Sequence, residues 1–353
     1  MASSRGRLFI ITHTDLDGEA AAASYMRIAG ARPDDVIIYF TEPYNLHESV
    51  DEVAEEVVEG DTVAIMDIGF NRDSTPRALE ALKGIVERGA RVEWYDHHVW
   101  DPRDAEQITK AGVKLFLDRS TCGAGVVIRY ASKLYGVEPD DFLRRLESAV
   151  CSADLWTWRD PLAPKLMRAS GSSNGPSKVR WKQNMVMKFY SGILWDDELQ
   201  ARLLDYLSSE LRNSTGDLMT LQVAESGDCR VAVVLRRTEL PSDSVMGSML
   251  TSRTNASIAA MVKRKGLGLV SVSLRSRGGA DVQVIAKELG GGGHPRAAGA
   301  SMRVNAVVYL LSFIWPRLLT RTVARRLLGL AIKLGACGES QADEGEGQAP
   351  MSY

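Results

Sequence analysis

Three short apolar runs in the first hundred residues each lead directly into acidic or imidazole side chains, and this pattern constrains the fold more than any other. The runs are residues 7–12 (RLFIIT), 62–66 (TVAIM) and 90–95 (ARVEWY). Stretches with helical character separate them, at residues 19–29, 47–58 and 76–88. Strands that alternate with helices predict a parallel sheet with crossover helices. Because ligand sites in such sheets lie beyond the carboxyl ends of the strands, we expect the polar residues to gather at one edge.

The polar residues at these strand ends have the chemistry of a divalent-metal site. They are His13, Asp15 and Asp17 after the first run, Asp67 after the second, and Asp96, His97 and His98 after the third. Carboxylates with imidazoles suit Mn²⁺, Mg²⁺, Fe²⁺ or Zn²⁺, and the lack of thiolates argues against a structural zinc site. Two such ions can stabilise both the attacking and the leaving oxygen of an in-line displacement. Asp67, alone at its strand end, is the candidate to bridge them. A single Asp after a strand is more often a cap, so the prediction depends on the three strand ends together.

A second cluster, GGGGHPRAAG at residues 290–299, predicts a backbone cradle for an anion. Consecutive glycines allow backbone N–H groups to converge on an anion, and a helix starting near Ala297 would add its positive end. The predicted donors are Gly291, Gly292, Gly293, His294 and Arg296, with Arg275 and Ser276 from an upstream strand. A flexible glycine linker is the alternative, which the following HPRAAG disfavours.

These motifs resemble the DHH phosphoesterase superfamily, in the subgroup with a DHHA1-type second domain. Asp15, Asp17 and Gly18 match the first motif, Asp67 the second, and Asp96, His97 and His98 the third. The LRS at residues 274–276 and the run at 290–299 match the DHHA1 signature, so the resemblance covers roughly residues 7–303.

The resemblance implies a role for each residue. His13, Asp15 and Asp67 are similar to ligands of one ion, and Asp17, Asp67, His97 and Asp154 to ligands of the second. Asp96 and His98 are implied catalytic residues, with His98 facing the substrate or a ligand carboxylate. Asp160 competes with Asp154 for the fourth motif, and His13 lies two residues before Asp15 where many relatives place it four before. The implied cofactor is two Mn²⁺ ions, with Mg²⁺ or another divalent ion as alternatives.

Bulk properties decide less. The net charge of −2 excludes a globally basic nucleic-acid binder, so binding would need local patches such as residues 165–188, where basic residues interleave with Trp181. The four cysteines have no paired spacing and indicate reduced thiols in an intracellular, cytoplasmic protein. His47, in a polar helical stretch, is expected at the surface or as a cap. No segment is long enough for a membrane span.

The expected architecture is α/β: a parallel-sheet DHH domain and a smaller α/β DHHA1-type domain, with the active site in the cleft between them. The expected domains are residues 1–190 and 215–305, joined by a helical connector at 191–214. Helices follow at 306–336, of which residues 317–334 form an amphipathic helix that packs on the second domain or binds a membrane surface or partner. Residues 337–353 are expected to be disordered.

The leading functional hypothesis is a metal-dependent exonuclease that degrades single-stranded or short nucleic acids to nucleoside monophosphates. A dinucleotide, cyclic dinucleotide or phosphoadenosine phosphate is the alternative substrate. Pyrophosphate or polyphosphate hydrolysis ranks third and a non-catalytic replisome scaffold fourth, since the metal motifs are intact. A homodimer is a further expectation left open.

Overall fold

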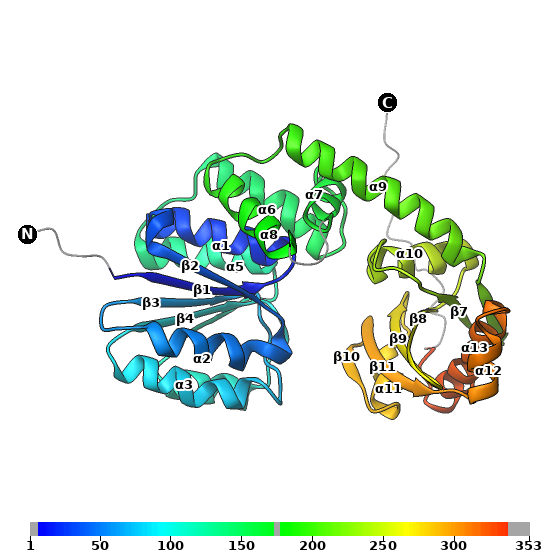
Figure 1. Cartoon of the computed structure of the whole chain (residues 1–353). Coiled ribbons are helices and arrows are strands. Elements are labelled where there is room, and N and C mark those ends of the chain that lie inside the picture. Colours follow the sequence, from blue (N-terminus) through cyan, green and yellow to red (C-terminus); the bar gives the residue numbers. More distant parts are fainter. Residues whose placement is uncertain (1–5, 173–176, 338–353) are drawn as a thin grey trace, which may run out of the picture. The chain divides into compact units, whose positions relative to one another are not determined.

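The computed structural model describes residues 6–172 and 177–337, which form two compact units. One extends to Asp205 and the other begins at Tyr206. The division falls inside the long helix α9 (Asp197–Leu218), which overlaps the expected connector. Figure 1 shows both units, each with its own sheet.

The first unit contains the expected parallel sheet, which has five strands in the order β2-β1-β3-β4-β5. The strands are β1 (Leu8–His13), β2 (Val36–Thr41), β3 (Thr62–Met66), β4 (Arg91–Asp96) and β5 (Lys114–Leu117). All neighbouring strands pair in parallel. The three strands predicted from the sequence are confirmed, whereas β2 and β5 were not predicted.

Helices cover both faces of this sheet (Figure 1). One layer contains α2 (Leu46–Glu56), α3 (Thr75–Glu87) and α4 (Pro102–Lys110), and the other contains α1 (Leu16–Ala29), α5 (Gly123–Tyr135), α6 (Asp141–Asp154), α7 (Ala163–Ser170) and α8 (Ser177–Tyr190). Successive strand residues alternate between the layers: Phe9 and Ile11 pack on the α2 side, and Leu8 and Ile10 on the α1 side. Alternation of apolar residues to both faces is what a fully covered sheet requires.

The second unit is built on a six-stranded mixed sheet in the order β10-β11-β9-β8-β7-β6. Its strands are β6 (Gln222–Ser226), β7 (Cys229–Leu235), β8 (Ile258–Gly266), β9 (Leu269–Ser276), β10 (Gly292–His294) and β11 (Ala297–Arg303). Helix α10 (Asp243–Thr254) packs on one face. Helices α11 (Val282–Glu288), α12 (Ala306–Leu311) and α13 (Pro316–Lys333) pack on the other. The amphipathic helix at 317–334 therefore packs its apolar side on its own unit.

The glycine segment differs from the expectation. No helix starts at Ala297; instead β10 and β11 form an antiparallel hairpin in which Gly293 pairs with Ala298. A Cβ on Gly293 would lie 2.5 Å from Ala298 Cα, and Gly293 has φ of 133°. Glycine is therefore needed here for close strand pairing, which explains part of the run without a phosphate cradle.

Two further expectations are wrong. The cysteines are paired: Cys122 is bonded to Cys151 and Cys229 to Cys337, at sequence separations of 29 and 108 that no short spacing reveals. His47 is buried, with its backbone N–H and its Nδ1 both 3.0 Å from Ser74 Oγ.

The sequence also predicted that no segment spans a membrane and that the end of the chain is disordered. In the described parts of the chain, no helix combines the length and apolarity that crossing a membrane would require. Disorder was predicted for residues 337–353, of which 338–353 lie outside the described residues, whereas Cys337 is described and bonded to Cys229.

Candidate metal centre

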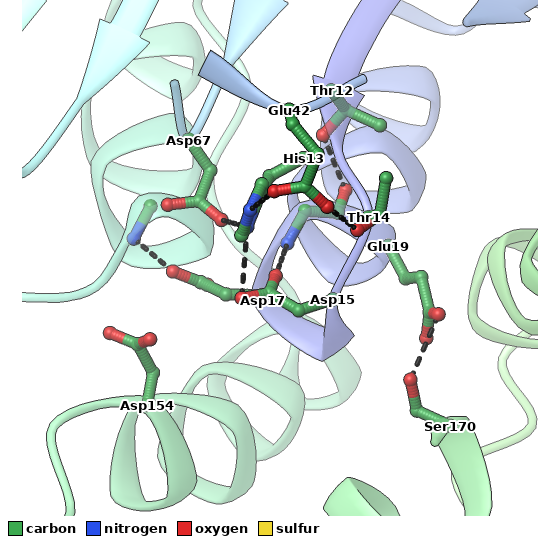
Figure 2. A network of polar contacts seen from close by, with 12 residues as sticks. Thr12, His13, Thr14, Asp15, Asp17, Glu19, Glu42, Asp67, Asp154 and Ser170 are labelled. Carbon is green, nitrogen blue, oxygen red and sulfur yellow. Dashed lines mark hydrogen bonds and ion pairs between the residues drawn. The ribbon is translucent and has the colours of Figure 1, made fainter. Parts of the chain in front are cut away.

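Four neighbouring strands end at the same edge of the parallel sheet, and each is followed by or ends in a polar residue. Figure 2 shows three of these residues, His13, Glu42 and Asp67. His13 ends β1, Glu42 follows β2, Asp67 follows β3, and Asp96 ends β4 with His97 and His98 after it. The motif residues predicted from the sequence are therefore brought together, although they are separated by up to 85 positions in the chain (His13 to His98).

The first group of converging side chains is His13, Asp15 and Asp67, whose potential ligand atoms all lie within 4.8 Å of one another. His13 Nδ1 is 2.9 Å from Asp15 Oδ2 and 3.6 Å from Asp67 Oδ2. Asp15 is also the N-cap of α1, because its other oxygen accepts from the backbone N–H of Gly18 at 3.1 Å. The cap fixes the carboxylate, so its remaining oxygen points toward His13.

The second group is Asp17, His97 and Asp154, also within 4.8 Å. His97 Nε2 lies 3.3 Å from Asp67 Oδ1, 3.7 Å from Asp154 Oδ2 and 4.0 Å from Asp17 Oδ2. Asp154 is the last residue of α6 and points up toward the sheet edge (Figure 2). Asp160, its sequence competitor, instead bonds to Arg145 and Ser148.

Asp67 stands between the two groups, with one oxygen facing His13 and the other facing His97. Its side chain is buried, yet Oδ2 has no hydrogen-bond partner among the described residues. A buried carboxylate oxygen without a partner is costly, which indicates that a cation belongs beside it. Asp67 also has φ of 55°, a left-handed conformation that is uncommon outside glycine and is found at functional sites.

The N-terminus of α5 holds Asp17. The backbone N–H groups of Gly123 and Ala124 donate to its two oxygens at 2.6 and 2.8 Å. The positive end of a helix stabilises a carboxylate in this position. Gly123 also has to be small, because a Cβ there would lie 2.7 Å from Asp67 Cβ.

Asp96 lies behind the two groups and orients His98. Its oxygens accept from His98 Nδ1 at 2.7 Å and from Trp100 Nε1 at 2.6 Å. A carboxylate on Nδ1 sets the ring orientation and the tautomer, as in many metal and catalytic sites. A third group within 4.8 Å, formed by Asp67, His97 and His98, shows that His98 also faces the centre.

The pKa values of these groups report an excess of negative charge. Burial raises the pKa of Asp17 well above its usual value, and the nearby Asp67 and Asp154 raise it further. Burial and Asp67 raise the pKa of Asp154 to about 7. Burial would lower the pKa of His97, but Asp67, Asp17 and Asp154 outweigh it and raise the pKa to about 10. Carboxylates that repel one another in this way, together with imidazoles and no thiolate, form a donor set that fits divalent cations such as Mn²⁺ or Mg²⁺.

Glu42 is a member of the site that the sequence analysis missed. It contacts His13 Nε2 at 3.2 Å and accepts from Thr14 Oγ1 at 2.5 Å. Burial alone would raise the pKa of Glu42, but the contacts with His13 and Thr14 outweigh burial and lower the pKa. The run VIIYF at 36–40 before it has the signature of a buried strand and could have identified this fourth strand end.

The residues expected to bind phosphate lie together in the second unit. Arg275 on β9 pairs in register with Ala297 of β11, and its guanidinium lies 3.3 Å from Ser244 Oγ. Ser276 Oγ donates to the Pro295 carbonyl at 3.1 Å. Gly291, Gly292, Gly293, His294 and Arg296 form an exposed hairpin beside this strand.

The sequence comparisons agree with the motifs. Residues 198–318 match the family model of the DHHA1 domain. A curated protein of Thermus thermophilus, the bifunctional oligoribonuclease and PAP phosphatase NrnA, is 45% identical over 65 residues, which is 18% of this chain and 19% of that protein. The match spans about a fifth of the length of this curated relative.

Solved structures are similar along most of the chain. The pGpG-specific phosphodiesterase PggH of Vibrio cholerae matches with a TM-score of 0.55 and 13% identity, over 88% of this chain and 99% of that chain. RecJ of Thermus thermophilus in complex with Mn²⁺ matches with a TM-score of 0.54 and 19% identity, over 91% of this chain and 52% of that chain. At these identities the likeness shows the fold.

Proposed function

We propose that this chain is a DHH-type two-metal phosphodiesterase that acts as an exonuclease on single-stranded or short oligonucleotides and releases nucleoside monophosphates. The DHHA1 match over residues 198–318 and the segment similar to the oligoribonuclease and PAP phosphatase NrnA support this proposal. Mn²⁺ is the proposed cofactor, with Mg²⁺ as the alternative. Single-stranded or short nucleic acid is the proposed partner.

One observation carries the proposal: Asp67 directs its two oxygens to two separate groups of ligands, and one of these buried oxygens has no hydrogen-bond partner among the described residues. We assign His13, Asp15 and Asp67 to one ion, and Asp17, Asp67, His97 and Asp154 to the other. Two divalent ions, when bound, supply the positive charge that stabilises the attacking and leaving oxygens of a phosphodiester in its transition state.

The remaining residues of the centre position substrate and protons. Asp96 holds His98 through Nδ1, so we propose that Nε2 of His98 contacts the scissile phosphate and stabilises its developing charge. Asp96 is itself fixed by the Trp100 indole, and its pKa is lowered because the bonds to His98 and Trp100 outweigh its burial. An ionised Asp96 keeps the ring in one orientation.

The second unit supplies phosphate recognition in this proposal. Arg275, Ser276, Arg296, His294 and the amides of Gly291, Gly292 and Gly293 are the donors that we assign to the substrate. Their hairpin is exposed, so it can bind a charged chain without desolvating it completely. An Arg can contact two phosphate oxygens at once, so Arg275 and Arg296 are suited to bind a phosphate group of the substrate.

Trp156 supports a nucleotide substrate. It follows Asp154 by two residues and has φ of 58°. Its ring is partly exposed and packs on Trp158, with the two ring centroids 4.4 Å apart. An exposed indole beside a phosphodiesterase centre is a platform on which a base can stack. Trp181, the other aromatic candidate, is buried and donates to the Ala169 carbonyl, so it is not available for stacking.

A panel of substrates tests the proposal. The chain is incubated with Mn²⁺ and with end-labelled RNA and DNA of two to twenty-four nucleotides, circular single strands, cyclic dinucleotides, PAP and pyrophosphate. We expect linear oligonucleotides to yield nucleoside monophosphates and circular strands to remain uncleaved. Cleavage of circles would contradict the end-dependent mode, and turnover of pyrophosphate without oligonucleotides would refute the nuclease assignment.

A dinucleotide or PAP phosphatase is the second candidate, and the 45% identical segment shared with the oligoribonuclease and PAP phosphatase of Thermus thermophilus favours it. The same panel separates the two. If dinucleotides and PAP are hydrolysed and strands of ten or more nucleotides are not, the second candidate replaces the first.

A further inference from the structure

An exposed apolar surface lies at the end of the second unit, and neither the metal centre nor the phosphate-binding hairpin accounts for it. It consists of Val307, Leu310, Leu311, Phe313, Ile314 and Trp315, on α12 and the turn that follows it (the α12 patch). Ile314 is 71% exposed and Trp315 60%. A contiguous exposed apolar patch on a globular unit is typical of an interaction surface.

The patch is an organised surface and not a frayed end. Val307, Leu310 and Leu311 follow helical spacing and share one side of α12, while Tyr309 is buried in the core. The Arg264 guanidinium lies 4.3 Å over the Phe313 ring and donates to the Ser312 carbonyl at 2.8 Å, which fixes the turn. Leu267, 71% exposed, lies in the β8–β9 turn, and the neighbouring Gly268 accepts from the Val304 backbone just before α12.

Positive charge flanks the patch in the sequence. Between Glu288 and Glu339 the sequence has no acidic residue but six arginines and one lysine, in a chain whose net charge is −2. Arg317, Arg321 and Arg325 recur every four residues along α13 and are exposed, whereas Leu319, Val323 and Leu327 point into the core. Lys265, also exposed, lies in the β8–β9 segment next to Arg264.

This combination favours one kind of partner. Four of the six patch residues are aliphatic and Arg264 covers the Phe313 ring, so Trp315 is the one patch ring left for a base to stack on, which argues against nucleic acid. A symmetric contact with a second copy would bring Arg317 and Arg321 close to like charges, which argues against self-association. Exposed aliphatic and aromatic side chains beside arginines, without intervening acids, complement a surface that is apolar below and anionic above.

We propose that the α12 patch binds the surface of an anionic lipid bilayer, with Leu310, Ile314 and Trp315 inserted at the headgroup boundary and Arg317, Arg321 and Arg325 contacting the headgroups. The long apolar stems of the arginines allow the charged ends to reach the headgroups while the neighbouring side chains are buried. The protein then binds membranes peripherally, independently of the reaction that the metal centre carries out.

Vesicle sedimentation tests this. The full chain is mixed with vesicles of phosphatidylcholine containing about 30% phosphatidylglycerol, or with phosphatidylcholine alone, at low and high salt. We expect binding to the anionic vesicles, weakened by salt. The double variant Leu310→Ser/Ile314→Ser should lower the partition coefficient by about tenfold or more, and Arg321→Gln/Arg325→Gln should reduce the preference for anionic over neutral vesicles.

A matched control removes exposed leucines elsewhere. Leu204→Ser/Leu211→Ser changes two exposed leucines of α9, so vesicle binding should stay within about twofold of wild type. All variants should retain the melting temperature and the hydrolytic activity, since none alters the core or the metal centre.

Three results would overturn the inference: no sedimentation with either vesicle, equal sedimentation with both, or an equal loss in the α9 control. Loss of oligonucleotide binding in the α12 variants would assign the patch to nucleic acid. Loss of a dimer in sedimentation velocity would assign it to a second copy.

Discussion

Asp67 combines three properties that rarely occur in one residue: a left-handed backbone, a buried side chain, and an oxygen without a hydrogen-bond partner in the described chain. Each is unfavourable by itself, so the surrounding fold has to enforce them. The backbone N–H of Asp67 donates to the Tyr95 carbonyl at 2.9 Å, which anchors the backbone of Asp67 to β4. At the residue scale, a cation bound between the two ligand groups would compensate this cost.

Asp67→Asn tests this compensation. Asn tolerates the left-handed region but cannot supply the bridging charge. We expect hydrolysis to fall by more than about 100-fold, beyond what the loss of an outer partner costs. In EDTA the variant should melt at the same or a higher temperature than wild type, because one of several repelling carboxylates is gone.

The control for that variant is Asp61→Asn, which changes an equally buried Asp whose oxygens accept from the Arg7 and Val58 amides. It should destabilise the chain and leave bound metal unchanged. Substantial metal-dependent activity in Asp67→Asn would show that the bridging assignment is wrong.

Glu42→Gln probes the support behind His13. The carboxylate on Nε2 keeps His13 in the ring orientation that presents Nδ1 to Asp15 and Asp67. Gln keeps the shape but loses the charge, so Mn²⁺ affinity measured by calorimetry should fall by about 10-fold. Glu87→Gln, on the exposed side of α3, is the control and should match wild type. Unchanged affinity in Glu42→Gln would exclude Glu42 from the centre.

At the scale of elements, the start of α5 limits the size of the centre. Gly123 donates to Asp17 and at the same time lies against the Asp67 side chain. One backbone position therefore fixes the spacing of two carboxylates that come from different strand ends.

Gly123→Ala should weaken metal binding although Ala normally stabilises helices. The added methyl group would lie 2.7 Å from Asp67 Cβ, so Asp67 has to move and Mn²⁺ affinity should drop by about 10-fold or more. Gly84→Ala in α3, where the nearest atom is the flexible end of Arg88 at 4.0 Å, should instead raise the melting temperature. Equal behaviour of the two variants in metal titrations would contradict the role of α5.

The elements also explain which features could be predicted from the sequence. Strands β1, β3 and β4 were predictable because each is an apolar run ending in acids, and Asp15, Asp17, Asp67, His97 and Asp154 follow from them and from the family resemblance. The contact of α5 with Asp17 was not, because it depends on a helix 106 positions away. The β10–β11 hairpin was not predicted because a run of glycines is compatible both with a loop and with closely paired strands. The pairing of Gly293 with Ala298, which distinguishes the two, is seen only in the structure.

For the whole molecule, the raised pKa values of the centre predict how stability depends on pH. A group whose pKa is raised by folding contributes stability that is lost as pH rises from its unfolded value to its folded one. For Asp154 that window runs from 3.8 to about 7, and for His97 from 6.5 to about 10. The groups whose pKa values are lowered, such as Glu42 and Asp96, change the stability with pH only below their usual pKa values of 4.5 and 3.8.

The metal-free protein should therefore melt at progressively lower temperature as pH rises from 5.5 to 8. Mn²⁺ should reverse this trend, because ions displace the bound protons and bind better at high pH. Melting curves in EDTA and in Mn²⁺ across this range measure both effects, and Asp154→Asn should flatten the EDTA curve. A melting temperature in EDTA that increases with pH would contradict the charge distribution described above.

The bond between Cys229 and Cys337 has a mechanical consequence. It joins Cys229, at the start of β7, to Cys337, shortly after the last helix. Most of the second unit therefore lies within one covalent loop, which closes over a sequence separation of 108 residues. If the two ends of the chain are pulled apart, this loop cannot lengthen even after its sheet has come apart. Roughly 360 Å of extended chain stays hidden from the pulling force until a reductant opens the bond. Under tension the second unit therefore behaves as a closed ring, and a thiol reagent determines how far the molecule can stretch.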